Sequence, residues 1–258
     1  DERNGRAVFM TDSRLTNKKG HRSNVNEILT AYGVKAHTDA LGMRRSKELS
    51  LVSGGLATRE RSTAQVTVTA GGYARHEITR DLRNYTLVFV NCAPLEVTRS
   101  RPRPGLEARE LLTGPERSWG ETTAIGKTEN ATYDPEEDLR RPVTAGVVVE
   151  PAGNPTGGKK NKQSNGRTDG PRLVVFGSSE SFVDFVVEQN RANLYVILNA
   201  INWLAGRSHM LGIPPRKMGV NTVDLTDGQV RLARWLFIGI LPGCVVALGL
   251  VVWRIRRR

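Results

Sequence analysis

The chain has 258 residues, 38% of them hydrophobic and 25% charged, which is enough for one sizeable domain or two small ones. Its formal net charge of +12 raises the question of nucleic-acid binding. The distribution argues against that function, because six arginines lie in the last 28 residues and the other charges are scattered without aromatic residues between them. The two cysteines, Cys92 and Cys244, form neither a disulfide framework nor a metal-binding spacing.

The N-terminal residues predict a strand followed by a helix. A short apolar run ending in Thr-Asp-Ser predicts a strand over 5–11. Apolar residues at helical spacing predict a helix over 23–32 that ends at Gly33. A layered α/β fold typically has this order of elements, in which a strand, a loop and a helix ending at glycine are followed by a new segment, here at 34–37.

Most of the later elements are predicted to be strands. The apolar residues of 40–64 follow neither a helical nor a strand periodicity, and residues 107–112 fit either a helix or a strand. Compact or alternating apolar runs predict strands at 65–69, 86–90, 144–150 and 172–177. The run at 86–90 (TLVFV) is predicted to be a central strand.

A polar loop and a long helix complete the folded part. Residues 153–170 are glycine-rich and polar, which predicts a disordered loop inside the domain, and its local basic run is expected to be solvated. A short helix is expected at 181–187, and Asn190 then caps a helix that runs to about residue 205 and ends at Gly206. The apolar residues that fall on one stripe of this helix are Leu194, Ile197, Leu198, Ile201 and Leu204.

Two positions could carry a nucleophile. Cys92 follows an apolar strand, as the thiol of an amidotransferase elbow does, but its neighbours lack the glycines that this strained turn requires. Residues 177–181 (GSSES) nearly match Gly-x-Ser-x-Gly, but the last glycine is absent and His209 is the sole later histidine. Capping of the next helix is the better interpretation for Ser179.

No other motif indicates chemistry. The sequence has no phosphate-binding loop, no dinucleotide-binding glycine fingerprint, no zinc-protease motif and no calcium-binding loop. It therefore predicts no catalytic residue, no cofactor and no metal ligand, and the chain is expected not to be an enzyme.

The C-terminal stretch 235–253 (WLFIGILPGCVVALGLVVW) contains no charge and is about 28 Å long as a helix, close to the thickness of a bilayer's hydrocarbon core. Trp235 and Trp253 bracket it, as aromatic residues do at membrane interfaces. The arginines that follow are Arg254, Arg256, Arg257 and Arg258, and they indicate a cytoplasmic end. The sequence thus predicts a connector over 213–231, a single transmembrane helix over 232–254 and a basic cytoplasmic tail over 255–258.

Small residues inside this stretch predict a surface for helix packing. Gly239, Gly243 and Ala247 recur every four residues, so they share one face of a helix, where another helix can approach closely. The chain opens with DERNGR and no apolar segment. A C-terminal anchor with the bulk outside the cytoplasm therefore requires an export signal or a first membrane helix before residue 1, or the reverse topology.

Four stretches resemble the auxiliary membrane component of uncharacterised ABC-type transport systems of the gliding-motility type. They are residues 22–39, 111–121, 133–149 and 172–206. The last block, with its strand, its Gly-Ser-Ser loop and the helix LYVILNAINWLAG ahead of the apolar stretch, is the most specific. Ser178 stands where the family carries an acidic residue at the strand end.

The resemblance implies an extracytoplasmic α/β domain over 1–212, layered like flavodoxin or a class I glutamine amidotransferase but without their active sites. It implies a non-catalytic accessory subunit of the cytoplasmic (inner) membrane, whose membrane helix contacts lipid. Its expected partners are an ABC permease and an ATPase. Asn199, Asn202 and Trp203 are expected to hold the last helix to the sheet. The alternatives are a membrane-tethered extracytoplasmic scaffold or binding protein, and a degenerate amidotransferase or hydrolase that uses Cys92 or Ser179.

Overall fold

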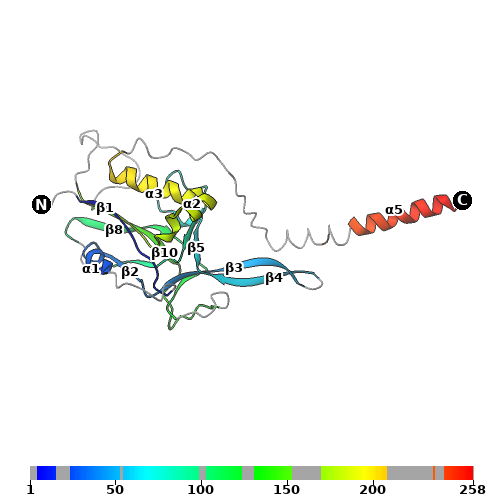
Figure 1. Ribbon diagram of the computed structural model, residues 1–258, viewed down its shortest axis with the longest axis horizontal. Helices are drawn as coiled ribbons and strands as arrows, with labels where there is room; N and C mark the ends of the chain where they lie inside the picture. Colours follow the sequence, from blue (N-terminus) through cyan, green and yellow to red (C-terminus); the bar gives the residue numbers. More distant parts are fainter. Residues whose placement is uncertain are drawn as a thin grey trace. The chain divides into compact units, whose positions relative to one another are not determined.

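The computed structural model describes residues 5–15, 24–52, 55–98, 103–123, 131–152, 170–207, 235 and 241–257. The chain divides into two compact units, Asp1–Pro215 and Arg216–Arg258. The first unit is built mainly from strands, with helices α1 and α3 on opposite sides of its largest sheet (Figure 1).

The elements follow one another in a β-rich order. The strands are β1 (Arg6–Met10), β2 (Val34–Ala36), β3 (Leu41–Val52), β4 (Gly55–Thr63), β5 (Gln65–Val68), β6 (Leu87–Val90), β7 (Leu95–Val97), β8 (Leu106–Thr113), β9 (Ser118–Glu121), β10 (Thr144–Pro151) and β11 (Arg172–Phe176). The helices are α1 (Val25–Thr30), α2 (Asp184–Gln189), α3 (Arg191–Leu204) and α5 (Leu241–Arg256), with short 3-10 turns η1 (Ala70–Gly72) and η3 (Glu180–Phe182).

The main sheet has six strands in the order β1-β11-β10-β7-β2, and β8 also pairs with β10. Strands β10 and β11 are buried along nearly their whole length, since both faces of the sheet are covered. Alternate residues of β1, β10 and β11 contribute to two separate apolar clusters, one with residues of α3 and the other with residues of α1. The core therefore lies on both sides of this sheet.

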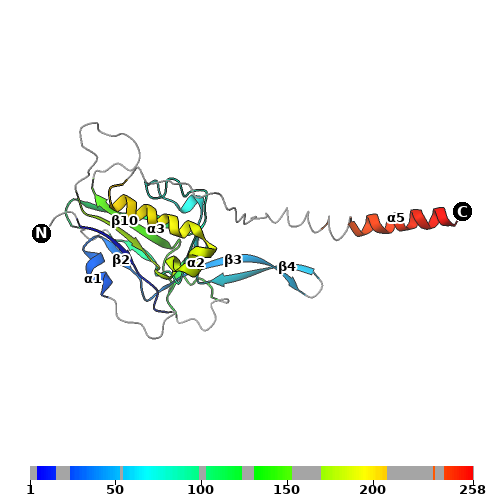
Figure 2. The ribbon, with the colours of Figure 1, turned by 45° about the horizontal axis from the view of Figure 1, so that its top comes forward.

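Two smaller sheets are attached to the main one. Strands β3 and β4 form a long antiparallel ribbon, which pairs with β9 near its base and extends away from the main sheet (Figures 1 and 2). Strands β5 and β6 form a two-stranded sheet. The strand predicted at 86–90 is thus confirmed as β6, but its predicted central position is wrong, because β6 pairs with β5 alone among the described strands.

The predicted flavodoxin-like or amidotransferase-like layering is wrong. That architecture needs parallel strands joined by crossover helices. Here β10 runs antiparallel to β7, β8 and β11, and β1–β11 is the single parallel pair within the described ranges. The physical reason lies between β2 and β8, where the chain forms the β3–β4 and β5–β6 hairpins in place of crossover helices. The domain is a mostly β structure around a curled mixed sheet.

A transmembrane helix is predicted over 232–254, and the structure does not contain it among its described residues. The described C-terminal helix is α5, which contains Pro242. Of the predicted span, residues 232–234 and 236–240 lie outside the described residues. Within the parts of the chain that the structure describes, no helix is both long and apolar enough to span a membrane.

Several predicted segments fall outside the described residues. They are the loop at 153–170 except Gly170, the connector at 213–231, and the terminal Arg258. The basic residues predicted to be solvated, namely Lys159, Lys160, Lys162 and Arg167, lie in the same undescribed loop.

Candidate functional site

A row of charged residues crosses the main sheet beneath the C-terminal end of α3. Arg6 lies opposite Arg172 in the β1–β11 register, and Glu150 lies opposite Glu107 in the β10–β8 register. In the antiparallel β10–β11 register, Val149 lies opposite Leu173. The next pair in the same register is Glu150 and Arg172. Because residues opposite each other share a face, two cations and two carboxylates form one row on the α3 side of the sheet.

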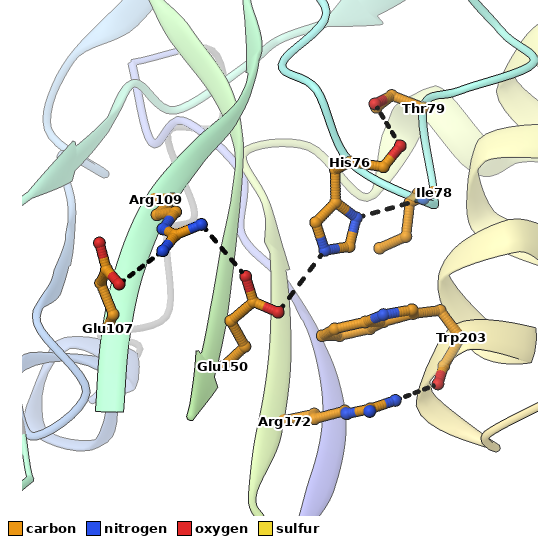
Figure 3. A network of polar contacts seen from close by, with 8 residues as sticks. All are labelled: His76, Ile78, Thr79, Glu107, Arg109, Glu150, Arg172 and Trp203. Carbon is orange, nitrogen blue, oxygen red and sulfur yellow. Dashed lines mark hydrogen bonds and ion pairs between the residues drawn. The ribbon is translucent and has the colours of Figure 1, made fainter. Parts of the chain in front are cut away.

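Glu150 is the centre of this network (Figure 3). It is 2% exposed, and its two carboxylate oxygens face different partners. Oε1 lies 3.6 Å from a guanidinium nitrogen of Arg109, and Oε2 lies 4.0 Å from Nε2 of His76. Arg109 also donates to Glu107 at 2.6 Å. No described residue donates a hydrogen bond to Glu150 Oε1. This oxygen is therefore held by its ion pair with Arg109.

The tautomer of His76 follows from its backbone contact. Its Nδ1 accepts a hydrogen bond from the Ile78 N–H at 3.2 Å, so the ring proton of the neutral imidazole lies on Nε2, on the side of Glu150. The carbonyl of His76 accepts a hydrogen bond from the hydroxyl of Thr79 at 3.1 Å. These contacts hold the β5–β6 connection in one conformation above the sheet.

Burial controls the ionisation of this cluster. Burial, aided by the positive charges of Arg172 and Arg109, lowers the pKa of His76 to about 4. Burial also raises the pKa of Glu150, although Arg109 and Arg172 oppose that shift. The hydrogen bond between Glu107 and Arg109 lowers the pKa of the Glu107 carboxyl and raises the pKa of Arg109. At neutral pH His76 is therefore uncharged.

Trp203 joins the network to α3. Its ring lies 4.7 Å from the guanidinium carbon of Arg172 and meets the His76 ring edge-on at 4.9 Å. Arg172 also donates to the Trp203 carbonyl at 2.9 Å, and Arg6 donates to the Leu204 carbonyl at 2.7 Å. Two arginines thus bind the last carbonyls of α3, where cations stabilise a helix.

The geometry of this network suits a structural role. His76 and Glu150 have side chains that are 3% exposed, so neither presents a titratable atom to an external substrate. Their contacts tie together β8, β10, β11, the β5–β6 connection and α3 (Figure 3). Chemically, the network can hold α3 rigidly on the sheet and can respond to acid, but it cannot exchange protons with a bound reactant.

The His76→Asn variant tests the ionisation of this network. Unfolded His76 binds a proton below about pH 6.5, whereas folded His76 remains neutral down to about pH 4, so the folded state loses about 3 kcal/mol of stability as the pH falls through that window. Asparagine preserves an acceptor for the Ile78 N–H and does not titrate. We expect urea unfolding at a series of pH values to show a smaller loss on acidification in the variant.

The raised pKa of Glu150 acts with the opposite sign, because the folded state then binds its proton more readily than the unfolded state does. That contribution is present in both proteins, so the difference between wild type and variant isolates His76. If the two proteins lost the same amount of stability on acidification, the loss could not be assigned to His76.

A second polar cluster lies where β1 and β11 end. Asp12 accepts hydrogen bonds from the backbone N–H of Ser179 at 2.7 Å and from the Ser179 hydroxyl at 2.5 Å. Ser178 donates to the Val90 carbonyl at 2.6 Å and accepts from the Ser181 hydroxyl at 2.7 Å. These serines fasten the turn before α2 to neighbouring strands. The predicted capping role of Ser179 is wrong, because its hydroxyl donates to Asp12 and makes no capping hydrogen bond.

Among the described residues, no histidine base lies beside Ser179. A serine attacks only when an adjacent base accepts its proton, and in a triad that base is a histidine. The Ser179 hydroxyl donates to a carboxylate instead. Of the two histidines that the structure describes, His37 pairs with Glu96 at 2.8 Å and His76 belongs to the network beneath α3.

Cys92 belongs to the apolar core on the α3 side of the sheet. It is 0% exposed, and its thiol donates to the Ala93 carbonyl at 3.5 Å. Burial and, to a lesser extent, the charge of Asp12 raise the pKa of this thiol well above its usual range. The thiolate that a catalytic cysteine requires is therefore strongly disfavoured.

The structure places the predicted C-terminal residues only in part. Trp235 and Trp253 are 70% and 55% exposed, and the Arg257 guanidinium lies 4.6 Å from the Trp253 ring centre. Among the described residues of this unit, Arg254, Arg256 and Arg257 are exposed. Of the predicted packing face, Gly243 and Ala247 belong to α5, one turn apart, while Gly239 lies outside the described residues.

No protein-family model matches the chain, and no curated protein matches it. Among solved structures, the chain is similar to one described as the mmIFT52 N-terminal domain, with 16% sequence identity and a TM-score of 0.44. The alignment covers 78% of this chain and 65% of that one, so the chain spans less than two thirds of that structure. A similarity of this size supports no inference about function.

The network beneath α3 was not predicted from the sequence. A usable signal was present, because Glu150 ends the apolar run of β10 and Arg172 begins the apolar run of β11. Charged residues at the ends of two buried strands indicate that the strands bring them together. His76 gave no such signal, since its partners become neighbours only after the β5–β6 connection folds over the sheet.

Proposed function

We propose that the chain is a non-catalytic accessory subunit of an ABC-type transport system, working at the cytoplasmic membrane with its folded domain on the extracytoplasmic side. The resemblance of four sequence stretches to such subunits supports this proposal. Its partners are then the permease and the ATPase of the same system, and its contribution is made by binding them.

The observation that carries the non-catalytic part is the state of the two candidate nucleophiles. Cys92 is buried with its pKa raised, and the hydroxyl of Ser179 is engaged by Asp12. A degenerate amidotransferase or hydrolase would need one of these groups to be accessible and activated. The geometry therefore favours a domain that acts through its surface.

An extracytoplasmic scaffold without a transporter is the remaining alternative. Neighbouring genes for an ATPase and a permease support the accessory subunit, and their absence favours the scaffold. The experiment that tests the proposal is co-isolation of the full chain with transporter subunits from native membranes.

A further inference from the structure

Helix α3 exposes apolar side chains on the side that faces away from the sheet. Leu194, Leu198 and Ile201 are 38%, 43% and 49% exposed. Their spacing of four and three residues places them in one row along the helix. The inner side of α3 is already apolar and filled, because Val196, Ala200 and Trp203 pack in the core. A surface helix normally presents polar residues to water on its outer side, so this row is unusual.

Helix α3 is also held rigidly from its buried side. Asn190 caps its first turn, and the Asn193 amide donates to the Val88 carbonyl at 2.7 Å while its oxygen accepts from the Val88 N–H at 3.1 Å. Asn199 donates to the Ile78 carbonyl at 3.0 Å. Together with the arginines that bind the last carbonyls, these contacts anchor the helix along its length. A surface fixed in this way binds a partner with little loss of conformational entropy.

The size of the row fits a single helix. Leu194 and Ile201 are about 10 Å apart along the helix axis. A stable interface between two globular proteins buries roughly 800 Å² on each side. Three partly exposed aliphatic side chains supply only a small part of that area, whereas they match the two-turn contact that one crossing helix makes.

The charge around the row favours an acidic partner. The sequence of α3 (RANLYVILNAINWL) contains no acidic residue, and exposed Arg191 and Arg207 lie at its two ends. The acidic residues Asp184 and Glu188 belong to α2, before the turn at Asn190. In a two-fold pairing of α3 with a second copy of itself, the antiparallel helices would bring Arg191 of one copy near Arg207 of the other. Self-pairing is therefore disfavoured.

We propose that the outer row of α3, Leu194, Leu198 and Ile201, is a docking surface for one amphipathic helix of a partner protein. The apolar stripe of that helix covers the row, and carboxylates flanking the stripe meet Arg191 and Arg207. The inference goes beyond the proposed function, because it defines the partner by its chemistry whether or not the partner is a transporter subunit.

Site-specific photo-cross-linking in cells tests this surface on the full chain. A benzophenone amino acid replaces Leu194, and in a second protein it replaces Ile28 of α1, which is 49% exposed on the other side of the sheet. We expect the Leu194 probe to attach to a protein segment whose sequence, mapped by mass spectrometry, has apolar residues at helical spacing flanked by Asp or Glu. The Ile28 probe is expected to give no such product.

A second pair of variants controls for folding. Ile201→Glu, combined with the Leu194 probe, is expected to reduce the cross-linked product about tenfold or more, while Ile28→Glu leaves it unchanged. Both replaced side chains are 49% exposed, so neither substitution is expected to disturb the fold. Unfolding curves that match the wild type check this for each variant. Attachment to a second copy of the chain, to lipid, or to a segment with basic flanks would overturn the inference, as would equal yields from both probes. Whether the attached protein is a transporter subunit bears on the proposed function alone.

Discussion

Replacing Trp203 by alanine is expected to lower the free energy of unfolding by about 3–5 kcal/mol, the usual cost of removing a buried aromatic side chain. The residue is 2% exposed and packs against both Arg172 and His76. Its loss leaves a cavity and also removes the aromatic face that lies against the buried guanidinium of Arg172. Urea unfolding followed by far-UV circular dichroism measures the change without depending on tryptophan fluorescence.

Leu198→Ala provides the matched control for this prediction. It truncates a side chain of the same helix, but one that is 43% exposed, so its cost is expected to stay within about 0.5 kcal/mol. A Trp203→Ala protein with nearly wild-type stability would show that α3 does not depend on the network beneath it. The role assigned to that network would then be wrong.

The Gly177→Ala variant is expected to be destabilised by about 3 kcal/mol because of steric overlap. An added Cβ would lie 2.2 Å from the backbone oxygen of Ala93 and 2.8 Å from the thiol of Cys92. The backbone oxygen cannot move freely, since the Ala93 N–H donates to the Gly177 carbonyl at 2.6 Å in the same contact. The prediction also tests the closed packing around Cys92.

Gly71→Ala is the control, because an added Cβ at that position meets no atom within 4 Å. Thermal unfolding of the two variants side by side is expected to show a clearly lower midpoint for Gly177→Ala alone. Equal midpoints would mean that the chain opens around Cys92, and the cysteine would have to be reconsidered as an accessible thiol.

Local patterns predicted individual elements well. The strands expected at 5–11, 65–69, 144–150 and 172–177 are confirmed as β1, β5, β10 and β11, and the long helix is confirmed as α3. These segments have clear apolar periods and turn residues at their ends, so the local sequence determines them. The helix at 23–32 is confirmed as the shorter α1, with Gly33 after it at a positive φ of 74°.

The arrangement of these elements was not predictable in the same way. Residues 40–64 form the β3–β4 ribbon, in which cross-strand pairs such as Lys47 with Glu60 and Glu48 with Arg59 alternate without an apolar period. Antiparallel pairing of β10 with β11 depends on contacts between segments that the polar loop separates. A layered α/β fold and a mostly β fold therefore contain similar short apolar runs, and these runs alone do not distinguish the two folds.

Helix α3 shows how a stripe can be assigned to the wrong side. Its apolar residues occupy both faces, and of the five predicted to share a stripe, Leu204 is buried whereas Leu194, Leu198 and Ile201 are exposed. The buried side combines the apolar residues Val196, Trp203 and Leu204 with two alanines and two asparagines. Trp203 is confirmed as holding the helix to the sheet through Arg172 of β11, whereas Asn199 donates to Ile78 of the β5–β6 connection, and Asn202 is half-buried. Only the packing could separate the anchored face from the exposed one.

Quantitative co-isolation of the full chain from native membranes tests the central claim most directly. The tagged chain is purified in mild detergent, and its Cys92→Ser, Ser179→Ala variant is purified in parallel. We expect an ABC permease and an ATPase to be recovered in near-stoichiometric amounts with both proteins, because binding requires neither side chain. Recovery of no transporter subunit above an untagged control would contradict the proposed function.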